Sequence, residues 1–497
     1  MLDFDLNLLF AFSLYLVFVL VVGIIFYTKT TKMSDYILGD RKLNSWVTSL
    51  SAQASDMSGW LLLGLPGYAY ATGVEASWIA IGLIAGTYLN WKLIAVRLRK
   101  YTEIAGNSLT ISDFFENRFR DNSKLLRTIS AVFILIFFVI YTASGFVAGA
   151  KLFNTIFGVS YLTALLIGAA FVVAYTFLGG FLAVCWTDFI QGTLMLFAII
   201  IVPIVGMQLM GGTSVTFDTI RAINPELLNP FTSADGSAIS VIAIISLLAW
   251  GLGYFGQPHI LVRFMAISSS SQIKKARIIA MFWVILTLGA AVIVGLVGRA
   301  YLAPPLEGAA TETVFMVMST QVFPSLVAGL LLAAVLSAIM STADSQLLVS
   351  ASALAEDFYK GLYKKNASEK ELIWISRFAV IGVSLVALSL ALKPDNNSVL
   401  DLVSYAWAGF GAAFGPTIVM SLYWNRTTRT GALAGIIIGG LTVLVWNPLS
   451  GGIFDLYEIV PGFIFSTLAI YIVSLMDKPP AQEILDEYDK AINSTDI

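Results

Sequence analysis

Long apolar runs separated by short polar loops dominate this sequence. Thirteen runs of about 20 residues or more are each long enough to cross the hydrocarbon of a bilayer as an α-helix. The first, Leu9 to Tyr27, follows no basic segment and precedes no small-residue cleavage site, so we expect a mature helix rather than a signal peptide. The pattern predicts an all-α membrane protein of 13 transmembrane helices, beginning near residues 9, 44, 75, 125, 160, 182, 239, 278, 314, 371, 399, 431 and 456.

Lysine and arginine are distributed unevenly among the loops between these runs. Twenty-five of the 29 fall on one predicted side, including eight at residues 92–127 and four at residues 263–277. The other side holds only Lys151, Arg221, Arg299 and Lys393. Basic loops stay in the cytoplasm, so the N-terminus is expected outside and the C-terminus inside a bacterial cytoplasmic (inner) membrane.

The composition agrees with a chain embedded in the lipid bilayer. Hydrophobic residues make up 58% and charged residues 12%, against about 25% charged in soluble domains. We expect one polytopic membrane domain, residues 1–477, and a short cytoplasmic tail, residues 478–497. The lone Cys185 excludes an intramolecular disulfide, and a net charge of -2 indicates neither a nucleic acid nor an obligate protein partner.

Two of the predicted spans contain residues that a lipid-facing helix would not tolerate. The second holds a crowd of hydroxyls and glycines with one carboxylate at residues 49–60, followed by Gly64-Leu-Pro-Gly67. The seventh holds a Gly- and Pro-rich segment at residues 250–258. Interrupted backbone at membrane depth is tolerated only inside protein or beside a watery cavity. We therefore predict breaks near Ser55 to Gly59 and in the seventh span, although simple kinks are common in membrane helices.

The two breaks lie five spans apart, which fits two inverted repeats: spans two to six and seven to eleven. Half-helix N-termini would offer partial positive charge to a substrate carboxylate, and unwound carbonyls would coordinate a small cation. An amino acid and a sodium ion suit this arrangement.

Several polar residues are candidates for such a site. Asp56 would be costly at mid-membrane unless it is paired, hydrated or functional. In the ninth span Ser337, Ser341 and Asp344 share a helix face, where the hydroxyls could hold sodium or make ordinary helix-to-helix hydrogen bonds. Asp188, at the inner end of span six, could gate sodium exit or cap a helix.

Other candidates have equally plain alternatives. Arg41 could act at the inner gate, or it could be one of the basic residues that cytoplasmic loops normally carry. Tyr141, Trp250 and Tyr254 could line a pocket for an apolar ring or pack in the bundle. His259, the only histidine, has no neighbouring ligand cluster, so we expect no metal site there beyond a transported ion.

Five segments resemble the solute:sodium symporter family, and within it the members that carry proline. They are Asp35-Tyr-Ile-Leu-Gly-Asp-Arg41, Ser51-Ala-Gln-Ala-Ser-Asp-Met-Ser-Gly-Trp60, Gly251-Leu-Gly-Tyr-Phe-Gly-Gln-Pro-His259, Met340-Ser-Thr342 and Ser404-Tyr-Ala-Trp-Ala-Gly-Phe-Gly411. The resemblance runs in order from about residue 10 to residue 475. It implies a LeuT-like fold, with one helix before the inverted repeats and two after them.

The resemblance also implies sodium-coupled uptake of L-proline, with specific residue roles. Sodium would bind the carbonyls of Ala54, Met57 and Ala338 and the side-chain oxygens of Ser341 and Thr342. Asp56, Arg41, Asp188 and Asp344 would support the sodium site or coupling. Proline would contact Ser58, Gly59, Trp60, Tyr141, Trp250, Tyr254 and Pro258.

One departure from the family pattern concerns ion selectivity. Asp344 and Ser345 stand where enterobacterial members have serine and cysteine, which leaves proton coupling or an altered selectivity open. Another small solute is an alternative to proline, and a sodium-conducting channel is the rival from a different class, although paired broken helices argue against a pore. The chain is not expected to be an enzyme, because it shows neither a nucleophile and base pair nor a metal cluster, and no cofactor is expected besides sodium.

Overall fold

The structure is a computed structural model that describes residues 5–27, 32–392 and 398–494. Lys29 and Lys393, which entered the loop count, and the last three residues of the predicted tail lie outside the described residues. The main helices of the bundle are α1 (Leu6–Tyr27), α3 (Ser45–Asp56), α4 (Leu65–Thr72), α5 (Ser77–Leu89), α6 (Ala95–Ile104), α8 (Leu125–Phe157), α9 (Tyr161–Leu178), α10 (Phe181–Leu209), α12 (Val241–Leu248), α13 (Pro258–Ala266), α14 (Ile273–Tyr301), α16 (Ser325–Ser352), α17 (Glu369–Ala391), α18 (Val399–Tyr423), α19 (Arg429–Trp446) and α20 (Ile459–Met476).

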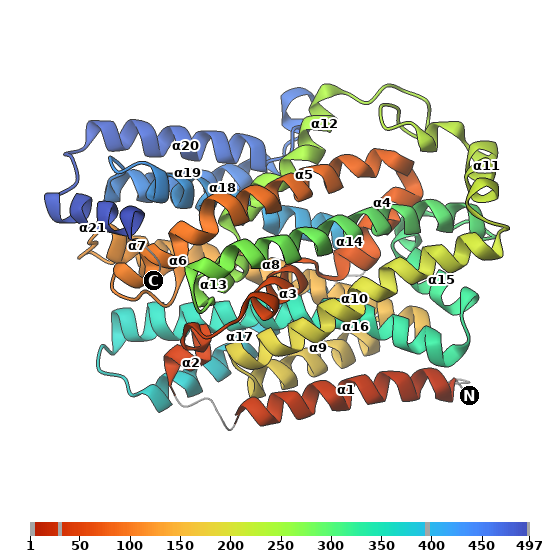
Figure 1. Ribbon diagram of the computed structural model, residues 1–497, viewed down its shortest axis with the longest axis horizontal. Coiled ribbons are helices and arrows are strands. Elements are labelled where there is room, and N and C mark those ends of the chain that lie inside the picture. Colours follow the sequence, from red (N-terminus) through yellow and green to blue (C-terminus); the bar gives the residue numbers. More distant parts are fainter. Residues whose placement is uncertain (1–4, 28–31, 393–397, 495–497) are drawn as a thin grey trace.

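These helices form one bundle and run roughly along its long axis (Figure 1). Among the described residues, ten helices are long and apolar enough to cross a membrane, and the bent pair α12 and α13 raises this number to eleven. A shorter apolar helix covers Tyr161–Phe177. An all-helical architecture with many apolar spans is therefore confirmed.

Both predicted breaks are present. Helix α3 ends at Asp56, and residues 57 and 58 interrupt it. Helical geometry resumes at Gly59, and the π-helical turn η2 (Trp60–Gly64) continues into α4. In the seventh span α12 gives way to the 3-10 segment η6 (Ala249–Gly256), and the chain then bends by 46° into α13.

Glycines bring α5 close to the second break. A Cβ on Gly82 would lie 2.3 Å from the carbonyl oxygen of Leu248, and a Cβ on Gly86 would lie 2.2 Å from that of Gly251. Small residues four positions apart let two helix backbones approach closely. Helix α5 therefore lies directly against η6 and holds it in the middle of the bundle.

The expected start of the ninth span was wrong. Residues 314–322 form a separate helix, α15 (Val314–Val322), and α16 begins at Ser325, after Pro324. The apolar run extends across both helices, so hydrophobicity alone could not separate them, whereas proline commonly begins a new helix.

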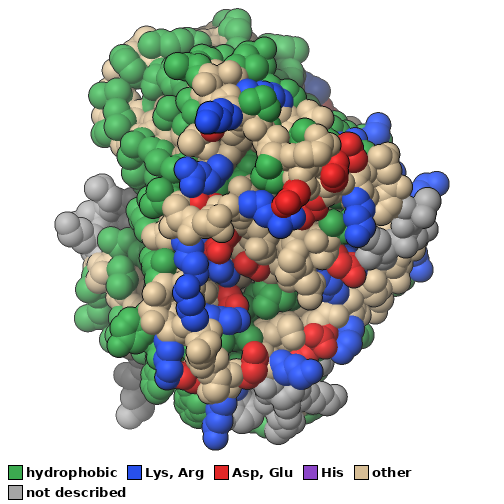
Figure 2. Space-filling view, turned by 90° about the vertical axis from the view of Figure 1, so that its left-hand side faces the viewer, with side chains coloured by type: hydrophobic (Ala, Val, Ile, Leu, Met, Phe, Trp, Pro, Cys, Tyr) green, Lys and Arg blue, Asp and Glu red, His purple; other side chains and the backbone are tan. Residues whose placement is uncertain are grey.

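Charged side chains gather at one end of the bundle, which we call the α7 end. It is formed by α2 (Met33–Leu38), α7 (Ile111–Arg118) and α21 (Gln482–Asn493), while α11 (Thr213–Ile223) lies at the opposite end (Figure 1). Figure 2 shows basic and acidic side chains spread over the α7 end, with hydrophobic side chains along its margin. Such a polar cap on an apolar bundle fits an aqueous boundary at this end.

Candidate functional site

Three hydrogen-bond donors stabilise the first break, and two of them are side chains. The carbonyl oxygen of Asp56 accepts hydrogen bonds from the Ser58 N–H (3.0 Å), the Trp60 indole N–H (3.2 Å) and the Tyr141 hydroxyl (3.3 Å). The Ser58 hydroxyl in turn accepts from the Trp60 N–H at 3.3 Å. The interruption is thus stabilised by polar groups that replace part of the lost helical hydrogen bonding.

The first break also packs too closely for larger residues. A Cβ on Gly59 would lie 2.8 Å from the Cβ of Ala148 on α8. The backbone of the break therefore lies directly against α8, the helix that carries Tyr141.

One residue of α18 holds the second break. The Trp407 indole N–H donates to the carbonyl of Trp250 at 2.7 Å, and the Gln257 amide donates to the carbonyls of Gly253 and Trp407. A Cβ on Gly253 would lie 1.9 Å from Nε1 of Trp407, so only glycine fits there. The sequence prediction missed Trp407, although it lies in one of the segments that carried the family resemblance.

The two breaks meet in the centre of the bundle. The Tyr254 hydroxyl donates to the Asp56 carboxylate at 2.6 Å, and the rings of Trp60 and Trp250 lie 6.1 Å apart. Tyr457, from the segment before α20, extends this aromatic group, because its ring lies 5.7 Å from that of Trp250. The predicted aromatic residues therefore cluster, and Tyr457 is a neighbour that the sequence prediction did not include.

Oxygen atoms of α3 and α16 converge beside the first break. The Ser341 hydroxyl donates to the carbonyl of Ala54 at 2.8 Å and lies 3.2 Å from the carbonyl of Ala338. The Thr342 hydroxyl lies 3.4 Å from the same Ala54 oxygen. Four of the five predicted sodium ligands are thus linked by three hydrogen-bond distances, two of which join α16 to α3, and such hard, uncharged oxygens suit a small cation.

Two predicted residues mark the edges of the breaks. Met57 is fully buried at the start of the first break, where its N–H donates to the carbonyl of Gln53 at 2.8 Å. Pro258 is the first residue of α13, where a missing N–H costs nothing.

Asp188 belongs to a second buried polar cluster. Its carboxylate accepts from the Ser51 hydroxyl at 2.7 Å and forms an ion pair with Arg263 at 3.2 Å, and the side chains of both ion-pair partners are 0% exposed. It does not cap α10, because Gly180 is the N-cap residue. The loop count included Arg263, but Arg263 lies inside α13, where its guanidinium also reaches the Ser345 hydroxyl.

The remaining residues of the predicted α16 face divide between these clusters. Asp344 is fully buried and accepts from the Ser345 hydroxyl at 3.4 Å, which connects it to Arg263. The Ser337 hydroxyl donates to the carbonyl of Ala333 at 2.8 Å, an ordinary hydrogen bond within the helix.

Arg41 lies at the α7 end, in a backbone conformation with positive φ. Its guanidinium donates to the carbonyls of Met265 and Ser108 and to the side chain of Asn107. Burial, with the nearby charge of Arg99, lowers the pKa of Arg41 to about 10. Arg41 thus joins the segment before α3 to the end of α13.

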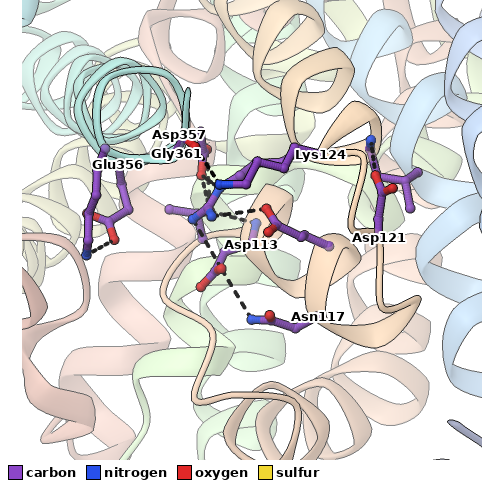
Figure 3. Close-up of polar contacts among 12 residues, drawn as sticks. Asp113, Asn117, Asp121, Lys124, Glu356, Asp357 and Gly361 are labelled. Carbon is purple, nitrogen blue, oxygen red and sulfur yellow. Dashed lines mark hydrogen bonds and ion pairs between the residues drawn. The ribbon is translucent and has the colours of Figure 1, made fainter. Parts of the chain in front are cut away.

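A further network of ion pairs lies at the α7 end. Arg127 contacts Asp357 at 2.9 Å, Asp113 at 3.1 Å and Glu116 at 3.1 Å. Figure 3 shows Asp113 and Asp357 directed toward the same point from α7 and from η9 (Ala353–Tyr363). One guanidinium therefore connects α7, α8 and the continuation of α16.

No group of three or more histidine, cysteine, aspartate or glutamate side chains that could hold a metal ion occurs within the described ranges. The interrupted helices instead present a cluster of aromatic rings, backbone carbonyls and hydroxyls. This chemistry suits reversible binding of a small solute and an alkali cation.

Comparisons of the sequence with known proteins give matches over most of the chain. A family model described as "Sodium:solute symporter family" matches residues 36–439. The "Sodium/proline symporter" of Salmonella typhimurium is 51% identical over 489 residues, covering 97% of this chain and 96% of its own. The "High-affinity proline transporter PutP" of Bacillus subtilis is 50% identical, covering 95% and 98%.

A solved structure has the same fold. A Na+-coupled sialic acid symporter, in a substrate-bound outward-open state, aligns with a TM-score of 0.80 over 97% of this chain and 100% of its own, at 20% identity.

Proposed function

This chain belongs to the sodium:solute symporter family, and from that premise we propose that it is a secondary active transporter that couples sodium entry to the uptake of L-proline by alternating access. It is a transporter, not an enzyme. The observation that carries the proposal is the meeting of the two broken helices at Asp56 and Tyr254, because symporters of this architecture bind substrate and ion between such breaks. Relatives named for proline transport, about half identical over nearly the whole chain, support proline as the solute.

Sodium binds the carbonyls of Ala54, Met57 and Ala338 and the hydroxyls of Ser341 and Thr342. The convergence of four of these oxygens supports the assignment. Because the ligands come from both α3 and α16, a bound ion ties these helices together and orders the residues of the first break.

Proline binds beside that ordered break. Its apolar ring suits the aromatic cluster of Trp60 and Trp250, and its carboxylate suits the positive N-terminal end of α13. The contacting residues are Ser58, Gly59, Trp60, Tyr141, Trp250, Tyr254 and Pro258.

Charged residues support coupling from outside these two sites. Asp56 orients Tyr254 between the breaks, while Asp188 and Asp344 influence the inner sodium path through Arg263. Arg41 stabilises the closed α7 end, since it binds the last turn of α13.

Sodium binds first, and proline binds more tightly to the ordered break. Thermodynamic linkage makes the effect reciprocal, so proline also tightens sodium binding. One sodium ion moving through about 100 mV supplies roughly 2.3 kcal/mol before any concentration gradient is added, which suffices for concentrative uptake.

The proposed architecture has 13 spans in one membrane domain, residues 1–477. Spans two to six and seven to eleven form the two inverted repeats of a LeuT-like core, with one helix before the core and two after it. The α7 end faces the cytoplasm of a bacterial inner membrane, as does the tail at residues 478–497, and the N-terminus faces outward. The concentration of basic residues at the α7 end supports this orientation (Figure 2). The proposal requires lipid, sodium and proline, and neither nucleic acid nor an obligate protein partner.

Uptake of radiolabelled L-proline into proteoliposomes, driven by an inward sodium gradient with a matched potassium control, tests the function. We expect proline to accumulate with the sodium gradient and not with the potassium gradient. We expect Asp56→Asn to abolish this accumulation. Sodium flux without proline would instead indicate a channel, and uptake of a different solute in a panel would retain symport while rejecting proline.

A further inference from the structure

His259 is a buried polar side chain at the candidate site whose ring forms no hydrogen bond with any residue that the structure describes. It is fully buried, and within the described part of the chain neither ring nitrogen has a hydrogen-bonding partner. The ring lies edge-on to Phe138, with centroids 5.6 Å apart, and to Tyr141, 6.0 Å away. A purely apolar side chain would suit these neighbours, whereas an imidazole carries one donor and one acceptor that are costly to bury unpaired.

The position of His259 places it between the two breaks. It is the second residue of α13, directly after Pro258 at the end of the 46° bend. Its neighbour Tyr141 donates to the carbonyl of Asp56, the oxygen that also anchors the first break. The histidine ring is therefore linked by one aromatic contact to the group that holds the opposite half of the site.

The surroundings of His259 favour an anionic partner. The N-terminal end of a helix carries partial positive charge, and here the helix has nine residues. Pro258 has no N–H, and the N–H groups of Ile260 and Leu261 already donate to the carbonyl of Gln257, so few backbone donors remain for a ligand. A ring N–H would add a directed donor to this positive end. A carboxylate would accept from the ring and be attracted by the helix end, whereas an ammonium group would be repelled by the helix end.

We propose that a ring N–H of His259 donates a hydrogen bond to the carboxylate of the transported solute and thereby helps to select free amino acids over their uncharged derivatives. The inference rests on the proposed function, because it takes L-proline as the solute. It adds a binding residue whose partner is the solute itself.

The test pairs a change in the protein with a change in the solute. Unlabelled L-proline and L-prolinamide compete with radiolabelled L-proline for sodium-driven uptake into proteoliposomes. We expect the preference for proline over prolinamide to fall roughly tenfold or more in His259→Phe, because a charge-assisted hydrogen bond is lost. His259→Gln keeps a side-chain N–H and is expected to retain most of the preference.

Phe138→Leu is the matched control, since it alters the packing of the same ring without removing a polar atom. It is expected to leave the preference unchanged. An undiminished preference in His259→Phe would overturn the proposal while leaving sodium-coupled proline uptake intact. If His259→Phe does not fold, His259→Leu in the same assay replaces it, and a preference lost in His259→Gln as severely as in the apolar variant would also reject a donor role. Absence of sodium-dependent proline uptake by the unaltered protein would overturn the proposed function and this ligand together.

Discussion

The hydroxyl of Tyr254 lies 2.6 Å from Oδ2 of Asp56, and this single hydrogen bond joins the two interrupted helices. Both residues are fully buried, and Oδ1 of Asp56 has no hydrogen-bond partner among the described residues. Tyr254 is therefore the side chain that fixes the direction of the carboxylate, next to the oxygens proposed to bind sodium.

Replacing Tyr254 with phenylalanine is expected to weaken proline uptake. A hydrogen bond to a charged group contributes about 1.5–3 kcal/mol, so the half-saturating proline concentration should rise about tenfold or more. Uptake measured over a range of proline concentrations checks this. Tyr36→Phe is the matched control, because the buried hydroxyl of Tyr36 has no hydrogen-bond partner among the residues that the structure describes, and its removal should change little.

Ser341→Ala is expected to raise the sodium concentration that half-saturates uptake by about tenfold, since one of the converging oxygens is lost. Ser337→Ala provides the control on the same helix, because its hydroxyl bonds to the carbonyl of Ala333 and to Tyr15 and is not one of the converging oxygens. Titration of proline uptake with sodium measures both. Equal shifts in the two variants would contradict the assignment of sodium to Ser341.

Asp188→Asn is expected to destabilise the fold by about 3–5 kcal/mol, because it leaves the Arg263 guanidinium buried without its counter-charge. Adding Arg263→Met should recover part of this loss. Thermal unfolding of the detergent-purified variants, followed by tryptophan fluorescence, gives the comparison. A double variant less stable than Asp188→Asn alone would show that the ion pair is not what the aspartate contributes.

The Arg127 network predicts a contrast between buried and exposed ion pairs. Arg127→Leu leaves Asp357, whose side chain is 0% exposed, without its counter-charge and should cost about 3–5 kcal/mol. Arg221→Leu breaks a pair whose side chains are 61% and 67% exposed and should cost at most about 1 kcal/mol. The same unfolding assay distinguishes them, and similar losses in both would contradict the structural role of Arg127.

Docking of α21 is expected to depend on pH through Glu487, which pairs with Arg120 at 2.9 Å. Burial raises the pKa of Glu487, although Arg120 and Arg118 oppose the shift. Because the docked carboxyl binds its proton more tightly than the undocked one, its contribution is present at low pH and is lost as pH rises through the docked pKa. Amide hydrogen exchange of α21, corrected for the intrinsic effect of pH, should show weaker protection at higher pH, and Glu487→Gln should remove that dependence.

The breaks were predictable from sequence because glycine, serine and proline crowd where lipid would demand a regular helix. Asp56 was predictable for the same reason, as a carboxylate within an apolar run. The serine and threonine at 341 and 342 were proposed by resemblance, and their approach to Ala54 depends on a contact between residues nearly 290 positions apart.

Arg263 shows why the rest was not predictable. In sequence it stands near three other basic residues, as expected for a residue of a cytoplasmic loop, yet the fold buries it against Asp188. Trp407 was similarly hidden, because tryptophan is common at membrane interfaces and nothing local indicates that its N–H holds Trp250. Both roles depend on which helices become neighbours, and apolar periodicity does not determine that.

The carbonyl of Asp56 draws two of its three donors from the side chains of Trp60 and Tyr141, and one of these comes from another helix. The residues of the segment favour the interruption, and the assembled bundle adds the third donor, Tyr141 of α8. A synthetic peptide of residues 45–72, placed in a detergent micelle, lacks the Tyr141 donor and would be expected to regain part of the helical hydrogen bonding across residues 57 and 58. The first break therefore takes its full geometry only when α8 packs against it.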